Sequence, residues 1–337
     1  MLSRREFLST FGARPFHVAE AAKVGVGHDR LARACVSGVL VRVGAGWYVV
    51  ADSATTWEAR LFVLHRENPG VVACGRTAAA IWGLPVPPCG RPRGATSLGV
   101  DMEPMEIGFR DGFGGLRGRR PDVMARRWKI PEHHVTEGPR GEPVTDPLRT
   151  AIDLARRAAL PFALGPLDAA SRLELSQADP WSSIKSMSPH DASRIVDNRL
   201  RERCADLVGG HGIAGVVRAL AHVNPLAESL LESLVRGRII ESGLPTPRLQ
   251  VPVIGASGRN YRADMALDLP GEPKGSGRLL IEADGLSKYD GPEVLAEEKR
   301  RQHDLERRDY VFVRALYVEA VVDPVAFVSV IRRYVQP

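Results

Sequence analysis

The stretch RLLIEADG, residues 278–285, decides the fold of the C-terminal third of the chain. A short apolar run that ends at a glycine is typical of a largely buried strand. Side chains alternate between the two faces of a strand, so Glu282 and Asp284 project together while the aliphatic side chains face the other way. The sequence therefore predicts two carboxylates on one face of a mostly buried strand.

The segments around this strand predict an α-β-β-β-α-β-α order for residues 224–337. A helix with an apolar stripe begins near Leu226, and two further strands are expected at 249–254 and 261–267. A helix rich in charged residues at 297–304 and an apolar strand at 310–314 follow. This order favours a single α/β domain built around one sheet.

Acidic residues on neighbouring strands of this domain predict a cation site. Burying carboxylates together costs free energy unless a cation or a basic group neutralises them, and Asp264 on the preceding strand completes the cluster. Mg²⁺, with Mn²⁺ as a substitute, prefers such oxygen ligands and can activate water beside a phosphodiester. Lys288 follows Asp284 by four residues and is a candidate for stabilising developing negative charge. The alternative is a polar rim on a sheet without catalytic activity.

Five sequence elements in order carry a family resemblance over residues 224–335. They are SLLE at 229–232, Asp264, IEADG at 281–285 with Lys288-Tyr289, EKRR at 298–301, and the apolar strand at 310–314. This pattern resembles a very-short-patch-repair-endonuclease-like domain of the PD-(D/E)XK nuclease superfamily. The resemblance implies Asp264 and Glu282 as metal ligands, Glu232 as an auxiliary acid and Lys288 as the basic catalytic residue. Asp284 stands where the family has its lysine, so Lys288 has to reach back.

The first 52 residues predict a winged helix-turn-helix. Helices are expected at 4–11, from Pro15 to about residue 22, and at 28–36, with a break at 25–27. Two β-prone runs, 39–43 and 47–50, then flank a glycine-rich tip and form a hairpin. In such a module the last helix enters the major groove, where arginine reads guanine edges, and the hairpin tip lies along the DNA backbone. The candidate DNA contacts are His28, Arg30, Arg33 and Arg42.

The run AEAAKVGVGHDRLARACVSGVLVRVGAGWYVV, residues 19–50, is similar to the N-terminal winged-helix domain of AbiEi-type antitoxins of type IV toxin–antitoxin systems. The resemblance covers residues 1–52 and implies binding to operator DNA, with a cognate toxin as a possible protein partner. The alternative from the residues alone is a helical pair and hairpin that packs against protein and never contacts DNA.

Residues 53–223 predict a mixed α/β connector. Between Arg110 and Lys129 there are seven basic and two acidic residues with interleaved aromatics, which suits either a phosphate backbone or a solvated loop. A helix is expected from Pro147, and Arg149 and Asp153, four residues apart, are expected to form an ion pair on it. The segment 176–192 is typical of a surface loop.

Composition bears on the partner, the compartment and the membrane association to be expected. The 337 residues carry a net charge of +6, which permits a polyanionic partner without requiring one. The four cysteines show neither a metal-binding spacing nor a disulfide pattern, which favours a reducing cytoplasm. The sequence has no apolar run of about 18 residues, so no membrane association is expected.

Together these patterns predict an α+β multidomain protein. Its predicted parts are a winged helix-turn-helix at 1–52, an α/β connector at 53–223 and a PD-(D/E)XK restriction-endonuclease-like domain at 224–337. The leading hypothesis is an intracellular protein that binds double-stranded DNA and carries a Mg²⁺-dependent endonuclease-like domain. The alternative is a non-enzymatic transcriptional regulator or antitoxin that binds its own promoter.

Overall fold

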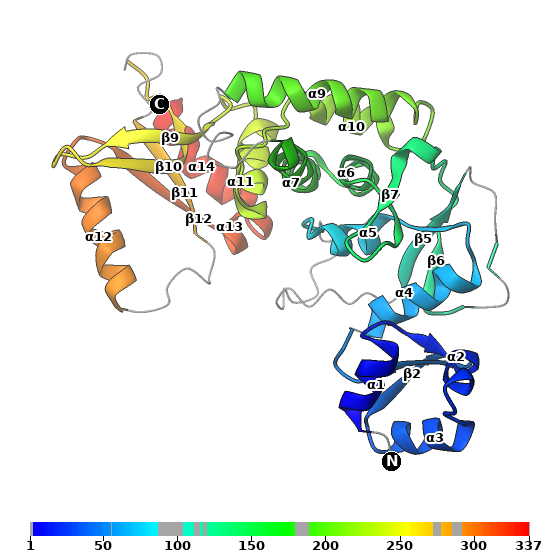
Figure 1. The fold of residues 1–337 in the computed structure, drawn as a ribbon. Helices are drawn as coiled ribbons and strands as arrows, with labels where there is room; N and C mark the ends of the chain where they lie inside the picture. The colour runs from blue at the N-terminus through cyan, green and yellow to red at the C-terminus, as the bar shows by residue number, and fades with distance from the viewer. Residues whose placement is uncertain are drawn as a thin grey trace. The chain divides into compact units, whose positions relative to one another are not determined.

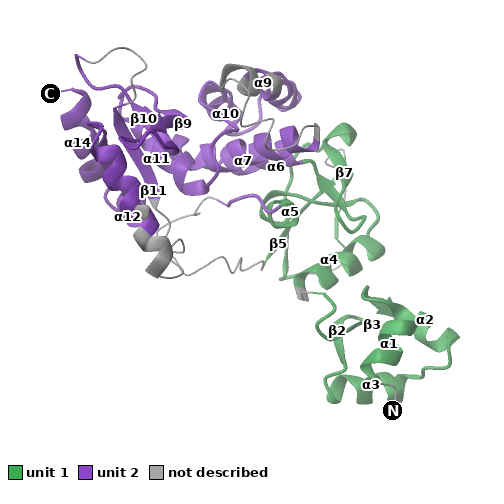
Figure 2. Cartoon of the chain, turned by 60° about the vertical axis from the view of Figure 1, so that its left-hand side comes forward, with its two compact units in different colours: residues 1–82, 96–146 green, residues 83–95, 147–337 purple. Residues whose placement is uncertain are grey.

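The computed structural model is a mixed α/β protein of two compact units (Figures 1 and 2). It describes residues 3–54, 56–86, 104–110, 115–116, 120–178, 189–271, 278–284 and 292–336. One unit comprises residues 1–82 and 96–146, and the other comprises residues 83–95 and 147–337. No described helix is both long enough and apolar enough to cross a membrane.

The N-terminal part of the first unit is a three-stranded antiparallel sheet with three helices. Its elements are α1 (Arg4–Phe11), β1 (Phe16–His17), α2 (Val18–Lys23), α3 (His28–Val36), β2 (Leu40–Gly44) and β3 (Trp47–Val50), with strand order β1-β3-β2. Ser3 and Glu6 form a capping box that begins α1. Phe7, Phe16 and Leu31 are buried together in the core.

The helix expected from Pro15 instead begins at Val18. Phe16 and His17 pair with Tyr48 and Trp47 as strand β1, which buries the Phe16 ring completely. The His17 ring then accepts a hydrogen bond from the Ala19 amide at 3.2 Å and caps α2. A two-residue strand leaves no periodic signal in the sequence, which is why the pattern alone gave a helix here.

The rest of the first unit is a five-stranded mixed sheet with order β6-β5-β4-β8-β7. Its elements are α4 (Thr56–Glu67), β4 (Val71–Ala73), α5 (Gly75–Trp82), β5 (Met105–Phe109), β6 (Val123–Ala125), η2 (Glu132–His134), β7 (Val135–Glu137) and β8 (Pro143–Thr145). Buried Leu61, Leu64 and Ile107 form its core.

Three arginines in the described part of the basic stretch 110–129 are held to this unit by ion pairs. Arg110 pairs with Glu132, Arg120 with Glu67 and Arg126 with Glu106. Residues 111–114 and 117–119, which include part of the predicted basic loop, lie outside the described residues.

The second unit begins with helices α6 (Pro147–Ala155), α7 (Leu160–Ala178), α9 (Pro189–Ala205) and α10 (Ile213–Leu220). The expected pair of Arg149 and Asp153 is confirmed at 2.9 Å, but both side chains are completely buried rather than on a solvated face. A second buried pair joins Asp168 on α7 to Arg236 at 2.6 Å. Most of the predicted loop 176–192 lies outside the described residues, although helices include both of its ends.

The C-terminal part of this unit is a four-stranded sheet with order β12-β11-β10-β9. Its elements are α11 (Leu230–Glu241), β9 (Arg248–Ile254), β10 (Asn260–Leu267), β11 (Leu279–Asp284), α12 (Pro292–Glu306), β12 (Val311–Leu316), α13 (Tyr317–Val321) and α14 (Pro324–Val335). β11 runs antiparallel to β10 and parallel to β12. Thus each strand and helix expected around residues 278–285 is present.

Candidate functional site

Three of the four predicted DNA contacts lie on α3. This helix begins at His28 and buries Leu31 and Ala34 in the core, which leaves His28, Arg30 and Arg33 exposed to solvent. The Arg33 Nε donates to the Asp29 carbonyl at 3.2 Å, so its stem runs along the helix. The basic groups of α3 are therefore carried on a rigid element.

The fourth predicted contact, Arg42, is exposed on β2, and its Nε donates to the Gly44 carbonyl at 3.3 Å. The hairpin tip beyond it packs against protein. A Cβ added to Gly44 would meet the Val63 side chain of α4 at 3.2 Å, and the Trp47 ring lies edge-on to Phe62 of α4 with centroids 6.1 Å apart. The tip is therefore fixed by α4, and Arg42 is the basic residue of this hairpin.

In the C-terminal part of the second unit, Glu232 is buried at the start of α11. Its Oε1 accepts from the Ser229 hydroxyl at 2.9 Å, and its Oε2 accepts from the Glu228 amide at 2.9 Å and from the Gln250 Nε2 at 3.2 Å. Burial raises the pKa of Glu232, and the nearby Asp264 carboxylate raises it further against the lowering effect of these hydrogen bonds. Glu232 thus lies near enough to Asp264 for the Asp264 charge to raise the Glu232 pKa.

Asp264 links β10 to β11. Its Oδ2 accepts a hydrogen bond from the Ala283 amide at 2.9 Å, next to Glu282 in the chain. Gln250 lies on the neighbouring strand β9 with a φ of 52°, in the left-handed region that non-glycine residues rarely adopt. Gln250 thus joins β9 to Glu232 of α11, whereas the hydrogen bond of Asp264 runs to β11.

Glu282 has a basic partner of its own. Its side chain is 9% exposed and its Oε1 accepts from the Arg301 Nη2 at 2.7 Å. The same Nη2 also donates to the Arg262 carbonyl of β10 at 2.9 Å. The charge that the sequence expected a metal ion to supply is supplied at Glu282 by a guanidinium from α12.

The donor atoms, as they lie, do not fit Mg²⁺. Mg²⁺ binds through one or two carboxylates and several waters, but the Glu282 Oε1 is engaged by Arg301 and the Asp264 Oδ2 by the Ala283 amide. Among the residues that the structure describes, Glu232, Asp264 and Glu282 also do not bring three ligand atoms within 4.8 Å of one another. Lys288 and the Asp284 side chain lie outside the described residues. Metal binding by Asp264 and Glu282 and the catalytic role of Lys288 stay predictions.

Gln250 was not singled out from the sequence, and Arg301 was named only as the last residue of the EKRR segment, not as the partner of Glu282. Arg301 precedes the buried Leu305 by four residues, so it shares the face of α12 that meets the sheet. That spacing could have identified Arg301 from the sequence. No sequence pattern identifies Gln250, because its role depends on an unusual backbone conformation.

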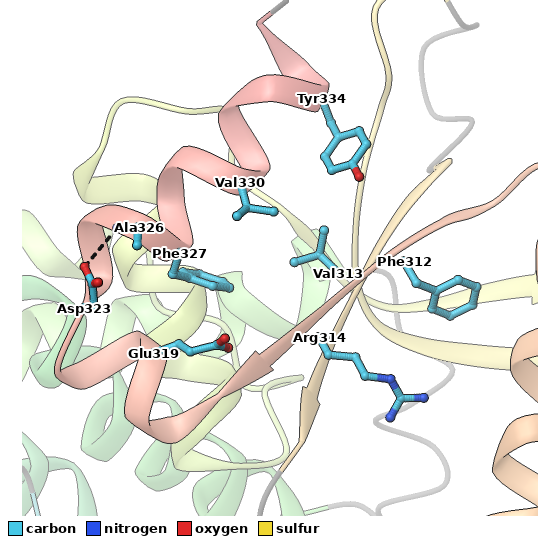
Figure 3. A pocket seen from close by; sticks show the side chains of 9 residues that line it. All are labelled: Phe312, Val313, Arg314, Glu319, Asp323, Ala326, Phe327, Val330 and Tyr334. Atoms are coloured by element: carbon cyan, nitrogen blue, oxygen red, sulfur yellow. Dashed lines mark hydrogen bonds between the residues drawn. The ribbon is translucent and has the colours of Figure 1, made fainter.

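A separate cavity of about 410 Å³ lies between β12 and helices α13 and α14. Val313 points toward Phe327 and Val330, whereas Arg314 points to the other side of the strand (Figure 3). None of the described residues predicted for a functional site lines this cavity.

The chain is similar in sequence to two proteins of a mycobacterium. No protein-family model matches it. The uncharacterized proteins MT2308 and Rv2248 of Mycobacterium tuberculosis are each 28% identical to it over 279 residues, which is 82% of this chain and 85% of theirs. The crystal structure of the RV2827C protein from the same organism has a TM-score of 0.36 and 14% identity, over 73% of this chain and 85% of that one.

Proposed function

We propose that the protein binds double-stranded DNA through residues 3–54. The observation that carries this proposal is the element order α1-β1-α2-α3-β2-β3 with sheet order β1-β3-β2, which is the order of a winged helix-turn-helix. In that arrangement α3 is the recognition helix, and its exposed residues would meet the major groove.

The charge of this segment supports the proposal. Residues 1–52 contain seven basic and four acidic residues, whereas residues 224–337 are nearly balanced. Arg30 is the best placed to read a guanine edge, because its side chain is exposed on α3 and arginine pairs with guanine in two hydrogen bonds. Arg33 and Arg42 are better suited to phosphates.

A binding assay with a salt series tests the proposal. Arg30→Ala combined with Arg33→Ala should weaken binding to a labelled duplex at least about tenfold, and should reduce the slope of log affinity against log salt by about one, because Arg33 is the residue of the pair assigned to phosphate. Fluorescence anisotropy at several salt concentrations measures both quantities.

The matched control removes two exposed arginines elsewhere, Arg307→Ala with Arg333→Ala, and keeps the same net charge. This control should bind as the wild type does. Equal weakening by both double variants would mean that net charge, rather than α3, governs binding and would count against the proposal.

Phosphodiester cleavage in the C-terminal sheet is the second candidate function. It is favoured by the closeness of Asp264 to Glu232 and to the main chain beside Glu282. The sheet order and the flanking helices α11 and α12 support a PD-(D/E)XK-like arrangement.

Incubation with supercoiled plasmid separates cleavage from simple binding. If the protein is an endonuclease, the wild type should nick plasmid in Mg²⁺ or Mn²⁺, and both Glu282→Ala and added EDTA should abolish nicking. Retained plasmid binding without nicking under any condition would instead favour the non-enzymatic regulator or antitoxin, whose site is its own promoter and whose protein partner is a cognate toxin.

A further inference from the structure

We infer that Arg301 is the resident cation of the C-terminal acidic site: its guanidinium occupies the place at Glu282 that the sequence assigned to a divalent metal ion, and it keeps such ions out. The inference concerns which cation Glu282 holds. It is independent of DNA binding, but it opposes metal-dependent cleavage through Glu282, so plasmid nicking that Glu282→Ala abolishes would count against it.

The contacts of Arg301 are those of a built-in counter-ion. Its side chain is 18% exposed, Glu282 is 9% exposed, and their atoms approach to 2.7 Å. A charge-assisted hydrogen bond of this length in a partly desolvated site is stronger than a surface ion pair. The second bond, to the Arg262 carbonyl at 2.9 Å, aligns the guanidinium between β10 and β11.

Helix α12 holds Arg301 in this position. Leu305, one turn later, is completely buried in the apolar cluster of Val253, Ala263 and Leu280. Asp304 beside it accepts hydrogen bonds from the Ser257 amide at 2.8 Å, the Ser257 hydroxyl at 2.6 Å and the Tyr261 hydroxyl at 3.0 Å. The helix is thus fixed to the sheet and to the β9–β10 turn, and this packing holds Arg301 beside Glu282.

A divalent cation at Glu282 would conflict with this arrangement. It would need the carboxylate oxygen that Arg301 engages, and it would place two like charges within a few ångströms of each other. Asp264, on the neighbouring strand β10, also has an engaged oxygen, since its Oδ2 accepts the Ala283 amide. Removal of the Arg301 charge would leave carboxylates in need of a cation, which is the condition under which an oxygen-liganded metal ion binds.

Titration with Mn²⁺ tests the inference on the full chain. Mn²⁺ serves as the probe because it takes oxygen ligands and is directly observed by electron paramagnetic resonance. The wild type should show no Mn²⁺ site that Glu282→Gln removes. Arg301→Met, which keeps most of the apolar stem and loses the charge, should gain a saturable site at least about tenfold tighter than any wild-type binding. Adding Glu282→Gln to Arg301→Met should remove that site.

Two matched variants separate local exclusion from a general charge effect. Lys299→Met removes an exposed positive charge from the same helix and should gain no site. Arg301→Lys keeps the positive charge beside Glu282 and should also gain none.

Either of two results would overturn the inference. One is a wild-type Mn²⁺ site that Glu282→Gln abolishes, since Arg301 would then not exclude the ion. The other is an Arg301→Met protein that melts cooperatively yet binds Mn²⁺ no better than the wild type. Should Arg301→Met fail to fold, the comparisons of wild type with Glu282→Gln and with Arg301→Lys decide the question, because a Mn²⁺ site in Arg301→Lys that the wild type lacks also contradicts exclusion by charge.

Discussion

His65 of α4 is a half-buried histidine whose buried Nε2 has no hydrogen-bond partner within the described part of the protein. Burial lowers the pKa of His65 to about 4. The folded protein therefore holds this ring neutral, whereas the unfolded chain protonates it below the ordinary histidine pKa of about 6.5. The free energy of unfolding is therefore unaffected by this ring above that pH and falls as the pH is lowered from about 6.5 toward 4. The shift corresponds to about 3 kcal/mol of unfolding free energy at most.

Replacement of His65 by Leu should remove this part of the acid sensitivity. Urea unfolding at pH 7 and at pH 4.5 measures it, and the loss of stability on acidification should be smaller in His65→Leu than in the wild type by up to about 2–3 kcal/mol. His303→Leu, which removes an exposed imidazole, serves as the control. Equal acid losses in His65→Leu and wild type would show that this ring does not limit stability in acid.

At the same scale, the sequence predicted some site residues and missed others for a definite reason. Asp264 and Glu282 were singled out because acids at these positions interrupt apolar strands, and Glu232 because the SLLE segment resembles a nuclease family. The pairing of Arg301 with Glu282 was not found, because it joins a helix to a strand 19 residues earlier and depends on how the helix packs. The sequence also gave Arg149 and Asp153 as a pair, but their complete burial follows from the helices that cover α6.

At the scale of the element, hydrogen bonds to the Asp304 carboxylate join α12 to the β9–β10 turn. The hydrogen bonds from Ser257 lower the pKa of Asp304 most, and the Tyr261 hydroxyl contributes. The stability supplied by the ionised group is present above the ordinary aspartate pKa and is lost as the pH falls through the lowered value. Gly255 is required in this turn, because a Cβ there would lie 2.0 Å from the Asp304 carboxylate.

Asp304→Asn should therefore loosen the β9–β10 turn. Hydrogen exchange at pH 7, followed by mass spectrometry, should show faster exchange of the Ser257 amide and its neighbours, because the amide side chain of Asn presents a donor to hydroxyl donors. Asp309→Asn is the control, since Asp309 is exposed and its φ of 63° also suits Asn. Unchanged exchange in Asp304→Asn would contradict the role given to this carboxylate.

Most elements were predictable because their periodicity is local. The helices at 28–36 and 147–155 and the strands around 278–285 lie where the pattern placed them. The helix expected from Leu226 instead begins at Leu230, because the Ser229 hydroxyl accepts from the Glu232 amide and sets the N-terminus there. The short strand β1 escaped prediction because its pairing with β3 involves residues about 30 positions away.

At the scale of the whole molecule, the three predicted segments do not coincide with the two compact units. The predicted connector, residues 53–223, is divided between them: 53–82 and 96–146 belong to the first unit, and 83–95 and 147–223 belong to the second. The boundary at residue 146 follows from strand pairing between distant segments, because β8 pairs in parallel with β4 through Val144 and Ala73. A composition shift along the chain carries no information on such a pairing.

The contact between the hairpin tip and α4 also determines where a fragment of the protein can end. A fragment that ends at Asp52 would expose the Trp47 ring and the surface beside Gly44 to water, where they would favour self-association. A fragment that continues through Glu67 retains Phe62 and Val63, and with them the native cover of the tip. The smallest piece of this protein in which the proposed DNA binding can be tested by itself therefore includes the whole of α4.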